Sequence, residues 1–261
     1  MASAPPSLPV FYKDLVPLNV EQHRNWRVRS AETAYFLVKE HAVPLTVDEF
    51  LQCQRHLPIV FSAGSEPVPL ALMGLNEGTN TLVDADGKLR NMNGYVPAYI
   101  RRYPWMLAKL DQTKDELSLC FDPTAPEVGE FGEGEGHLLI DESGEASAVT
   151  KEILTFCEQF EQAARRTQQF MADVAEAGLL MDGELTIQTP ISDQPFIYRG
   201  FQMIDEQKLR DLRGDQLRKF SQSGMLPLLY AQLFSLQVMR EIFEAQLQLG
   251  VGPVAAMMPA A

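Results

Sequence analysis

Two short patterns each occur twice, in the same order, in the N-terminal part of the chain. This internal similarity restricts the fold more than any single motif. The first pattern is "RHLPIVF" (55–61), which is matched by "RRYPWML" (101–107). In each, a run of helical character meets a proline one residue after a bulky side chain, and apolar residues follow. Because proline lacks an N–H and disfavours helix in the preceding residue, each pattern predicts a helix-to-strand junction.

The second pattern is "LVDADGK" (82–88), which is matched by "LIDESGE" (139–145). Two apolar residues, an aspartate, two further residues and a glycine predict a strand that enters a tight turn. We interpret the two pairs as a hypothesis of internal duplication, with related α/β units over 43–90 and 95–146. Chance is the alternative, because both patterns are common and the spacing between them differs.

The character of the chain changes near Ser147. Upstream, short apolar runs bounded by Gly, Pro and Asn predict strands, whereas downstream the apolar residues follow helical spacing. The sequence therefore predicts an α+β protein, in which a mixed-sheet α/β region over 15–146 packs on a mainly helical subdomain over 147–250. We expect residues 1–14 to form a flexible Pro-rich arm and residues 251–261 a disordered tail.

Within the helical subdomain, Ser147 is predicted to cap a long amphipathic helix, with Gly178 at its C′ position. Shorter elements follow: strands "LTIQTP" and "FQMID" around a loop at "ISDQPFIYRG", a helix capped by Asp205, and a helix begun by Gly214 or Asp215 that ends near Gly224. A final apolar helix is expected over 226–249.

Composition excludes several classes of partner. The net charge of −13 repels phosphate backbones, so no nucleic acid is expected. The three cysteines lack C-x-x-C spacing, which argues against a disulfide framework and a structural zinc site and favours a reducing compartment. The first residues lack the pattern of a secretory signal, and no apolar run is long enough to span a bilayer. We therefore expect a cytoplasmic protein.

No sequence motif specifies a reaction. G-x-S-x-G, P-loop and G-x-G-x-x-G patterns do not occur, and the four histidines have no neighbouring metal ligands, so no cofactor or metal is expected. The Gly-rich "GEFGEGEG" (129–136) is predicted to be a flexible acidic loop. Asp84 and Asp86 suit either a calcium or acid–base site or an Asx-type turn, and their spacing favours the turn.

The segment "YVPAYIRRYPW" (95–105) combines three tyrosines, a tryptophan and two adjacent arginines. Its prolines predict a short helix, and the macrodipole favours cations at the C-terminal end of that helix. The alternative is a pocket of cations and aromatic rings for a carboxylate, an aromatic ring or a peptide. The candidate ligand- or partner-binding residues are Tyr99, Arg101, Arg102, Tyr103 and Trp105, together with His56 and Asp84.

The order of several segments resembles the bacterial SapC family. These segments are "PLN…HR", "VPL…EF…PIVF", "GL…G…N…VD..G" (74–87), "YVPAYIRRYPW", "GFQMIDEQKL" and the "LLYAQLFSL" run, and the resemblance covers about residues 15–249. It implies a link to surface-layer proteins, without agreed catalytic residues. Family members are encoded near flavin-dependent halogenase-like proteins and TonB-dependent receptors, which implies an accessory role in surface or uptake systems. The family has a histidine where this chain has Gln232, so a catalytic role at that position is not expected here.

Two hypotheses about function follow. The first is a SapC-like accessory or interaction protein that recognises a peptide or protein partner, such as a component of those halogenase-like or TonB-receptor systems, with surface association as a further option. The alternative is an enzyme or small-molecule-binding protein that uses the Arg101–Trp105 surface with Asp84 or Asp86. A shallow apolar groove would favour the first, and a closed pocket with converging Asp or His the second. The sequence predicts neither a particular reaction nor an oligomeric state.

Overall fold

The chain forms two compact units, each built from two separate segments. The computed structural model describes residues 8–91, 94–111, 113, 116–189 and 192–251. Unit 1 comprises Met1–Thr33 and Tyr99–Gln162, and unit 2 comprises Ala34–Ala98 and Ala163–Ala261. The domain limits expected at residues 14, 146 and 250 stay predictions. Most of the expected tail and the first half of the expected arm lie outside the described residues.

Unit 1 contains two small antiparallel sheets. Its elements are β1 (Val16–Pro17), β2 (Arg27–Val28), α2 (Ala98–Arg102, whose first residue counts with unit 2), β6 (Trp105–Ala108), β7 (Ser118–Phe121), β8 (Val128–Gly129), β9 (His137–Leu138) and the first half of α3 (Ala148–Glu176). The strand orders are β1-β7-β6 and β8-β2-β9. Trp105, Leu107, Phe121, Leu139 and Cys157 belong to the core that these sheets share with α3.

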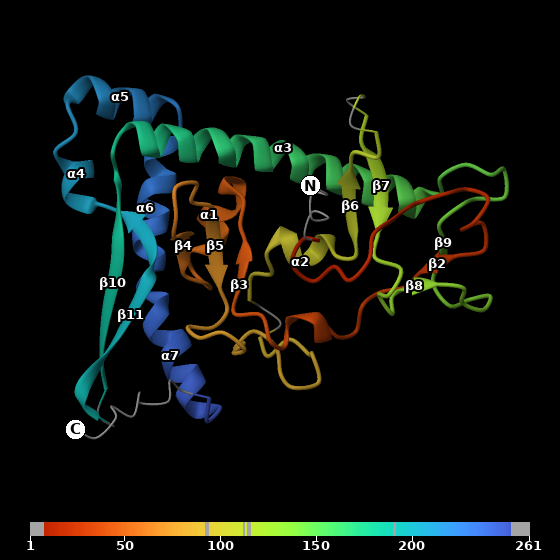
Figure 1. Ribbon diagram of the computed structural model, residues 1–261, viewed down its shortest axis with the longest axis horizontal. Coiled ribbons are helices and arrows are strands. Elements are labelled where there is room, and N and C mark those ends of the chain that lie inside the picture. The colour runs from red at the N-terminus through yellow and green to blue at the C-terminus, as the bar shows by residue number, and fades with distance from the viewer. Residues whose placement is uncertain (1–7, 92–93, 112, 114–115, 190–191, 252–261) are drawn as a thin grey trace, which may run out of the picture. The chain divides into compact units, whose positions relative to one another are not determined.

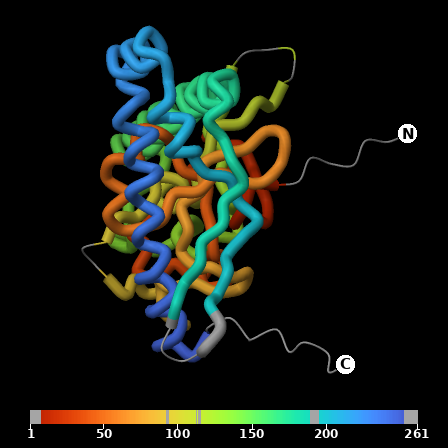
Figure 2. Tube along the Cα trace, turned by 90° about the vertical axis from the view of Figure 1, so that its left-hand side faces the viewer, coloured from red at the N-terminus to blue at the C-terminus, as the bar shows by residue number. Residues whose placement is uncertain are grey.

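Unit 2 contains a five-stranded antiparallel sheet and most of the helices. Its elements are η1 (Tyr35–Leu37), β3 (Ala42–Pro44), η2 (Val47–Glu49), α1 (Phe50–Cys53), β4 (Ile59–Ser62), β5 (Pro69–Leu72), the second half of α3, β10 (Leu180–Thr189), β11 (Ser192–Ile204), α4 (Glu206–Arg210), α5 (Gly214–Gln222), α6 (Met225–Ser235) and α7 (Val238–Gln248). The strand order is β10-β11-β4-β5-β3. Figures 1 and 2 show the β10–β11 hairpin beside α6 and α7. The α+β class and the C-terminal helical region are confirmed, while the strand pairing between described residues is antiparallel rather than mixed.

The predicted helix-to-strand junctions and the predicted tight turns are present, but the residues before each turn form an isolated β-bridge rather than the expected strand. Helix α1 is followed by Pro58 and β4, and α2 is followed by Pro104 and β6. In the second pattern, Asp84 Oδ1 accepts the N–H groups of residues 86 and 88, at 2.9 Å each. Asp141 Oδ1 accepts those of residues 143 and 145, at 3.0 Å each. Asp84 therefore forms an Asx-type turn, as the sequence favoured.

The glycines of these two turns hold the same backbone conformation. Gly87 has φ 74° and Gly144 has φ 86°. Residues that carry a side chain disfavour this left-handed region, so glycine suits both positions. An isolated β-bridge closes each turn, Val83 to Leu89 in unit 2 and Ile140 to Ala146 in unit 1. The two D-x-x-G sequences thus specify one and the same hairpin-like turn.

The structure extends the repeat to a third strand that the sequence analysis missed. Three neighbouring strands have the order β3-β5-β4 in unit 2 and β1-β7-β6 in unit 1. In each set of three, the strand that comes first in the sequence pairs with the strand that comes last. The earliest strands carry the same "VPL" sequence, at 16–18 and at 43–45. Leu18 N–H donates to Leu119 O (2.8 Å), and Leu45 N–H donates to Pro69 O (3.0 Å). The units therefore share this three-stranded arrangement, and its origin by duplication stays a prediction.

The predicted helix limits in the C-terminal half are mostly correct. Ser147 Oγ accepts the N–H of Thr150 at 3.3 Å, as expected of a helix cap. Gly178 lies two residues after Glu176, the last residue of α3, and has φ 66°, which is the conformation of a C′ glycine. Asp205 caps α4 by accepting the N–H of Lys208, and α5 begins at Gly214.

The expected loop at "ISDQPFIYRG" is wrong, because its described residues belong to β11. Among the described residues, β11 pairs with β4 at Phe201 and Gln202 alone. The edge of β11 away from β10 is therefore unpaired at Pro195, where a missing N–H costs no sheet hydrogen bond.

The single final helix is also wrong, because α6 ends at Ser235 and α7 begins at Val238. The Ser235 hydroxyl donates to the carbonyl of Gln232 (2.6 Å), which the N–H of Leu236 would use in a continuous helix. Leu236 N–H instead reaches Leu233 O at 3.3 Å, and the helix is interrupted.

The buried carboxylate of Glu49 connects distant segments of unit 2. Its Oε2 accepts the N–H (3.0 Å) and the hydroxyl (2.8 Å) of Thr46, in the manner of a capping box. Its Oε1 accepts the hydroxyl of Tyr95 (2.8 Å) and the N–H of Ala98 (2.6 Å), the first residue of α2. Glu49 is 6% exposed, so these donors have little access to water if the carboxylate is lost.

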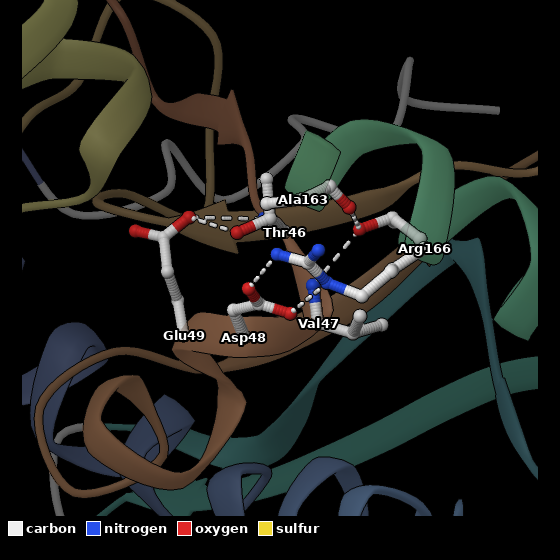
Figure 3. Close-up of polar contacts among 7 residues, drawn as sticks. Thr46, Val47, Asp48, Glu49, Ala163 and Arg166 are labelled. Atoms are coloured by element: carbon white, nitrogen blue, oxygen red, sulfur yellow. Dashed lines mark hydrogen bonds and ion pairs between the residues drawn. The ribbon is translucent and has the colours of Figure 1, made fainter. Parts of the chain in front are cut away.

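The same turn also attaches the second half of α3. Thr167 Oγ1 accepts the N–H of Val47 (3.0 Å) and donates to Ala163 O (2.8 Å). Arg166 Nε donates to Asp48 Oδ1 at 3.1 Å, in an exposed pair. Figure 3 shows Glu49 directed to Thr46 and Arg166 directed to Asp48.

We expect Glu49→Ala to lower the free energy of unfolding by about 3 kcal/mol, because it leaves several buried donors unpaired. Asp48→Ala is the matched control and should cost at most about 1 kcal/mol, since the pair with Arg166 is exposed. Urea denaturation of both variants measures the difference. Equal losses would show that the Glu49 carboxylate does not hold the unit together.

Candidate functional site

Helix α2 places its two arginines in different environments. Arg102 is 5% exposed, and its guanidinium lies 4.2 Å from the ring centroid of Phe160 and 5.1 Å from that of Tyr99. Its Nη1 is 3.4 Å from Glu161 Oε1. Two aromatic faces and one carboxylate therefore stabilise a buried cation in unit 1.

Arg101 is exposed and lies at the rim of a hollow in unit 1. Its guanidinium is 5.4 Å from the ring centroid of Phe156. The hollow has a volume of about 260 Å³ and a mainly apolar lining, formed by Arg101, Arg102, Trp105, Glu152, Ile153, Phe156 and Cys157. Burial raises the pKa of Cys157 to about 12, so the thiol in this lining is neutral. The hollow thus presents an apolar floor with a cation and a carboxylate at its edge.

The two tyrosines of the predicted surface bind the N-terminal segment of unit 1. Tyr99 donates its hydroxyl to Val10 O (3.2 Å), and its ring is 5.5 Å from that of Phe11. The ring of Tyr103 is 5.3 Å from that of Tyr12, whose hydroxyl donates to Trp105 O (2.7 Å). These residues of the expected flexible arm therefore cover the tyrosine side of the segment.

Asp122 connects the N-terminal segment at Lys13 to Tyr103. Its carboxylate accepts the N–H of Lys13 (2.7 Å) and both the N–H (2.9 Å) and hydroxyl (2.7 Å) of Thr124, and lies 3.4 Å from the Tyr103 hydroxyl. Burial raises the pKa of Asp122, but these hydrogen bonds outweigh it and hold that pKa below its usual value. Burial, together with the charges of Asp122 and Glu127, raises the pKa of Tyr103.

The structure gathers five of the seven candidate residues in unit 1. Tyr99, Arg101, Arg102, Tyr103 and Trp105 lie within or directly after α2, with Trp105 in the core at 5% exposed.

The remaining two candidates, His56 and Asp84, belong to unit 2 and do not share a site there. His56 lines a separate hollow, whereas Asp84 holds the tight turn described above. That any of the seven binds a partner stays a prediction.

Sequence reasoning missed the residues that position this segment. Glu49 follows Thr46 in the order T-x-x-E, which is the sequence pattern of a capping box. Asp122 begins "DPT", a typical turn sequence. Both patterns can be recognised in the sequence, but neither predicts which distant N–H or O–H groups donate to the carboxylate.

Gln232 is structural in this chain. It is fully buried, accepts the N–H of Ile204 (3.1 Å) and donates to Ile59 O (2.9 Å), so it links β11 to β4. The side-chain amide supplies one acceptor and one donor to two strands, which accounts for a polar residue in the core.

These features define an α+β protein with two similar antiparallel units and an arginine–aromatic surface. The sequence profile of the SapC family matches residues 18–242, and the chain belongs to this family. Searches of curated proteins and of solved structures found no match to it. Within the described part of the chain, no helix has both the length and the apolar character needed to cross a bilayer.

Replacing the two arginines of α2 singly should separate their roles. We expect Arg102→Ala to lower the free energy of unfolding by about 2–4 kcal/mol, because it leaves a cavity between two rings and removes the partner of Glu161. Arg101→Ala is the matched control, and its exposed side chain predicts a change within about 0.5 kcal/mol. Thermal and urea unfolding measure both, and a stable Arg102→Ala variant would contradict the buried environment.

The acid sensitivity of unit 1 should depend on Asp122. A folded-state pKa below the ordinary 3.8 adds stability above that pH, and this stability is lost as the pH falls through the folded-state pKa. We therefore expect Asp122→Asn to cost about 1–2 kcal/mol at neutral pH. The difference from wild type should shrink as the pH drops below 3.8, as measured by urea unfolding across pH. A pH-independent difference would rule out this contribution.

Proposed function

We propose that this SapC-family protein is an accessory protein that recognises a peptide or protein partner through the surface around Arg101. The observation that carries the proposal is the apolar hollow beside that residue. Trp105 and Cys157 of its lining belong to the core of unit 1, and Ile153 packs against that core, so this part of the lining is held in place before any partner binds.

The charges at the edge of the hollow support a side-chain-specific contact. Arg101 and Glu152 both line the hollow and are exposed, and the rest of the lining is mainly apolar. An apolar centre with charged groups at its rim is the usual anatomy of a protein–protein contact. The partner segment that fits has a large apolar side chain next to an acidic residue, which would pair with Arg101.

Family membership supports the choice of partner. The chain belongs to the SapC family. The resemblance implies a link to surface-layer systems, with halogenase-like proteins and TonB-dependent receptors as companions. We propose that the partner is a component of such a surface or outer-membrane uptake system, met in the cytoplasm or at the cell surface. The alternative, an enzyme or small-molecule binder at the Arg101–Trp105 surface, is less supported because Asp84 is engaged in its own turn in unit 2.

Arg101→Glu should weaken partner binding at least tenfold, equivalent to about 1.4 kcal/mol, because it reverses the charge beside the hollow. The measurement is biolayer interferometry of the full chain against purified halogenase-like protein and TonB-dependent receptor. Arg165→Glu, an exposed change on α3 in unit 2, is the matched control and should bind like wild type. Equal binding by Arg101→Glu and wild type, or no binding to either protein, would contradict the proposal.

A further inference from the structure

Unit 2 contains a second hollow that the proposed function does not use. It has a volume of about 270 Å³ and lies between the end of α1, the segment at Leu82, the turn at Tyr95 and helix α7. The helix contributes Val238, Glu241, Ile242 and Ala245, which share one face because of their three- and four-residue spacing. This volume is just below the range of about 300–1,000 Å³ for pockets that hold drug-sized ligands, so it suits one small molecule rather than a peptide segment.

Buried polar side chains hold three of its walls. The Tyr95 hydroxyl donates to Glu49 (2.8 Å). Asn80 Oδ1 accepts the N–H of Leu82 (2.7 Å), while Gln246 Oε1 accepts that of Leu75 (2.6 Å) and so fixes α7. Asn80 is 8% exposed and Gln246 fully buried, so water competes little for these bonds. The hollow is therefore formed in advance, which lowers the entropic cost of binding a ligand.

Three ionisable side chains on the lining have no partner within the described chain. Arg55, His56 and Glu241 are exposed, and none of their side chains has a hydrogen bond or ion pair with another described residue. In contrast, Arg240, the neighbour of Glu241 on α7, pairs with Glu244 at 3.0 Å. The charged and polar groups of these three side chains are thus available to a ligand.

The chemistry of these groups matches a zwitterion. The Arg55 guanidinium presents the planar fork that carboxylates accept, and the imidazole of His56 adds an N–H donor in either protonation state. Glu241 supplies the carboxylate that an ammonium group needs. Leu82, Val238 and Ile242 are each at most 8% exposed and give an apolar wall for the rest of the ligand.

The internal repeat explains why this site lies in unit 2. Arg55 and His56 precede Pro58 as Arg101 and Arg102 precede Pro104, and each pair lines a hollow that includes a helical glutamate. In unit 1 the second member of the pair is buried against aromatic rings. In unit 2 both members are exposed. We propose that the Arg55–Glu241 hollow binds a free α-amino acid with an apolar side chain, its carboxylate on Arg55 and His56 and its ammonium on Glu241.

The test uses the full chain and defined probes, with binding measured by calorimetry and saturation-transfer NMR. L-valine, L-leucine and L-phenylalanine are the amino acids, and 4-methylpentanoate and 3-methylbutylamine are leucine without its amine or its carboxylate. We expect at least one of the three amino acids to bind. If leucine is the ligand, each of its two truncated analogues should bind at least tenfold more weakly than leucine itself. For a valine or phenylalanine ligand, the corresponding acid and amine replace them.

The variants assign each charge to its role. Arg55→Ala and Glu241→Gln should each weaken amino-acid binding at least tenfold. Glu241→Gln should leave the affinity for the acid alone unchanged, and Arg55→Ala that for the amine alone, which a merely structural defect would not do. Arg240→Ala is the control on the same helix and should bind like wild type, and circular dichroism verifies the folding of all three.

Three results would overturn the proposal. The first is no saturation by any of the three amino acids up to about 10 mM, which is weaker than ordinary ligand binding. The second is unchanged amino-acid affinity in folded Arg55→Ala. The third is an acid that binds as tightly as its amino acid, together with no effect of Glu241→Gln, which would define a site for simple carboxylates. None of these results bears on the Arg101 surface, so this proposal and the proposed function fail separately.

Discussion

The Glu49 carboxylate is the interaction on which most of unit 2 depends. It accepts four hydrogen bonds from three places in the sequence: the turn before α1, Tyr95 and the first residue of α2. A buried carboxylate is tolerated only when its acceptor capacity is used, and here it is used by donors that would otherwise be buried without partners. The same contact sets one wall of the Arg55–Glu241 hollow and the start of the helix that carries Arg101.

The two units use one backbone plan for different purposes. A "VPL" strand, a short helix followed by a proline, a hairpin of strands and an Asp-x-x-Gly turn occur in both. The plan places a pair of basic residues at the same point, before Pro58 and before Pro104. What differs is the surroundings, because unit 1 buries Arg102 among aromatic rings and unit 2 leaves His56 at the surface of a hollow.

Buried amides recur as the connectors between helices and strands. Gln232 joins β11 to β4, Gln246 fixes α7 to the segment at Leu75, and Asn80 shapes the loop before Leu82. An amide carries both a donor and an acceptor without charge, so it satisfies two backbone groups at a lower desolvation cost than an ion pair. This also accounts for Gln232 where the family resemblance implies a histidine.

The sequence by itself determined the local structure: the proline junctions, the Asp turns, and the caps at Ser147 and Asp205. These depend on backbone conformations and hydrogen bonds within a few residues, which local side chains specify. Most strand pairings, the interruption after Ser235 and the environment of each arginine were decided only by the tertiary structure. Arg101 and Arg102 are adjacent and chemically identical, yet one is exposed and one buried. Phe160 and Glu161, far from Arg102 in the sequence, supply one of the rings and the carboxylate around it, and no local pattern contains them.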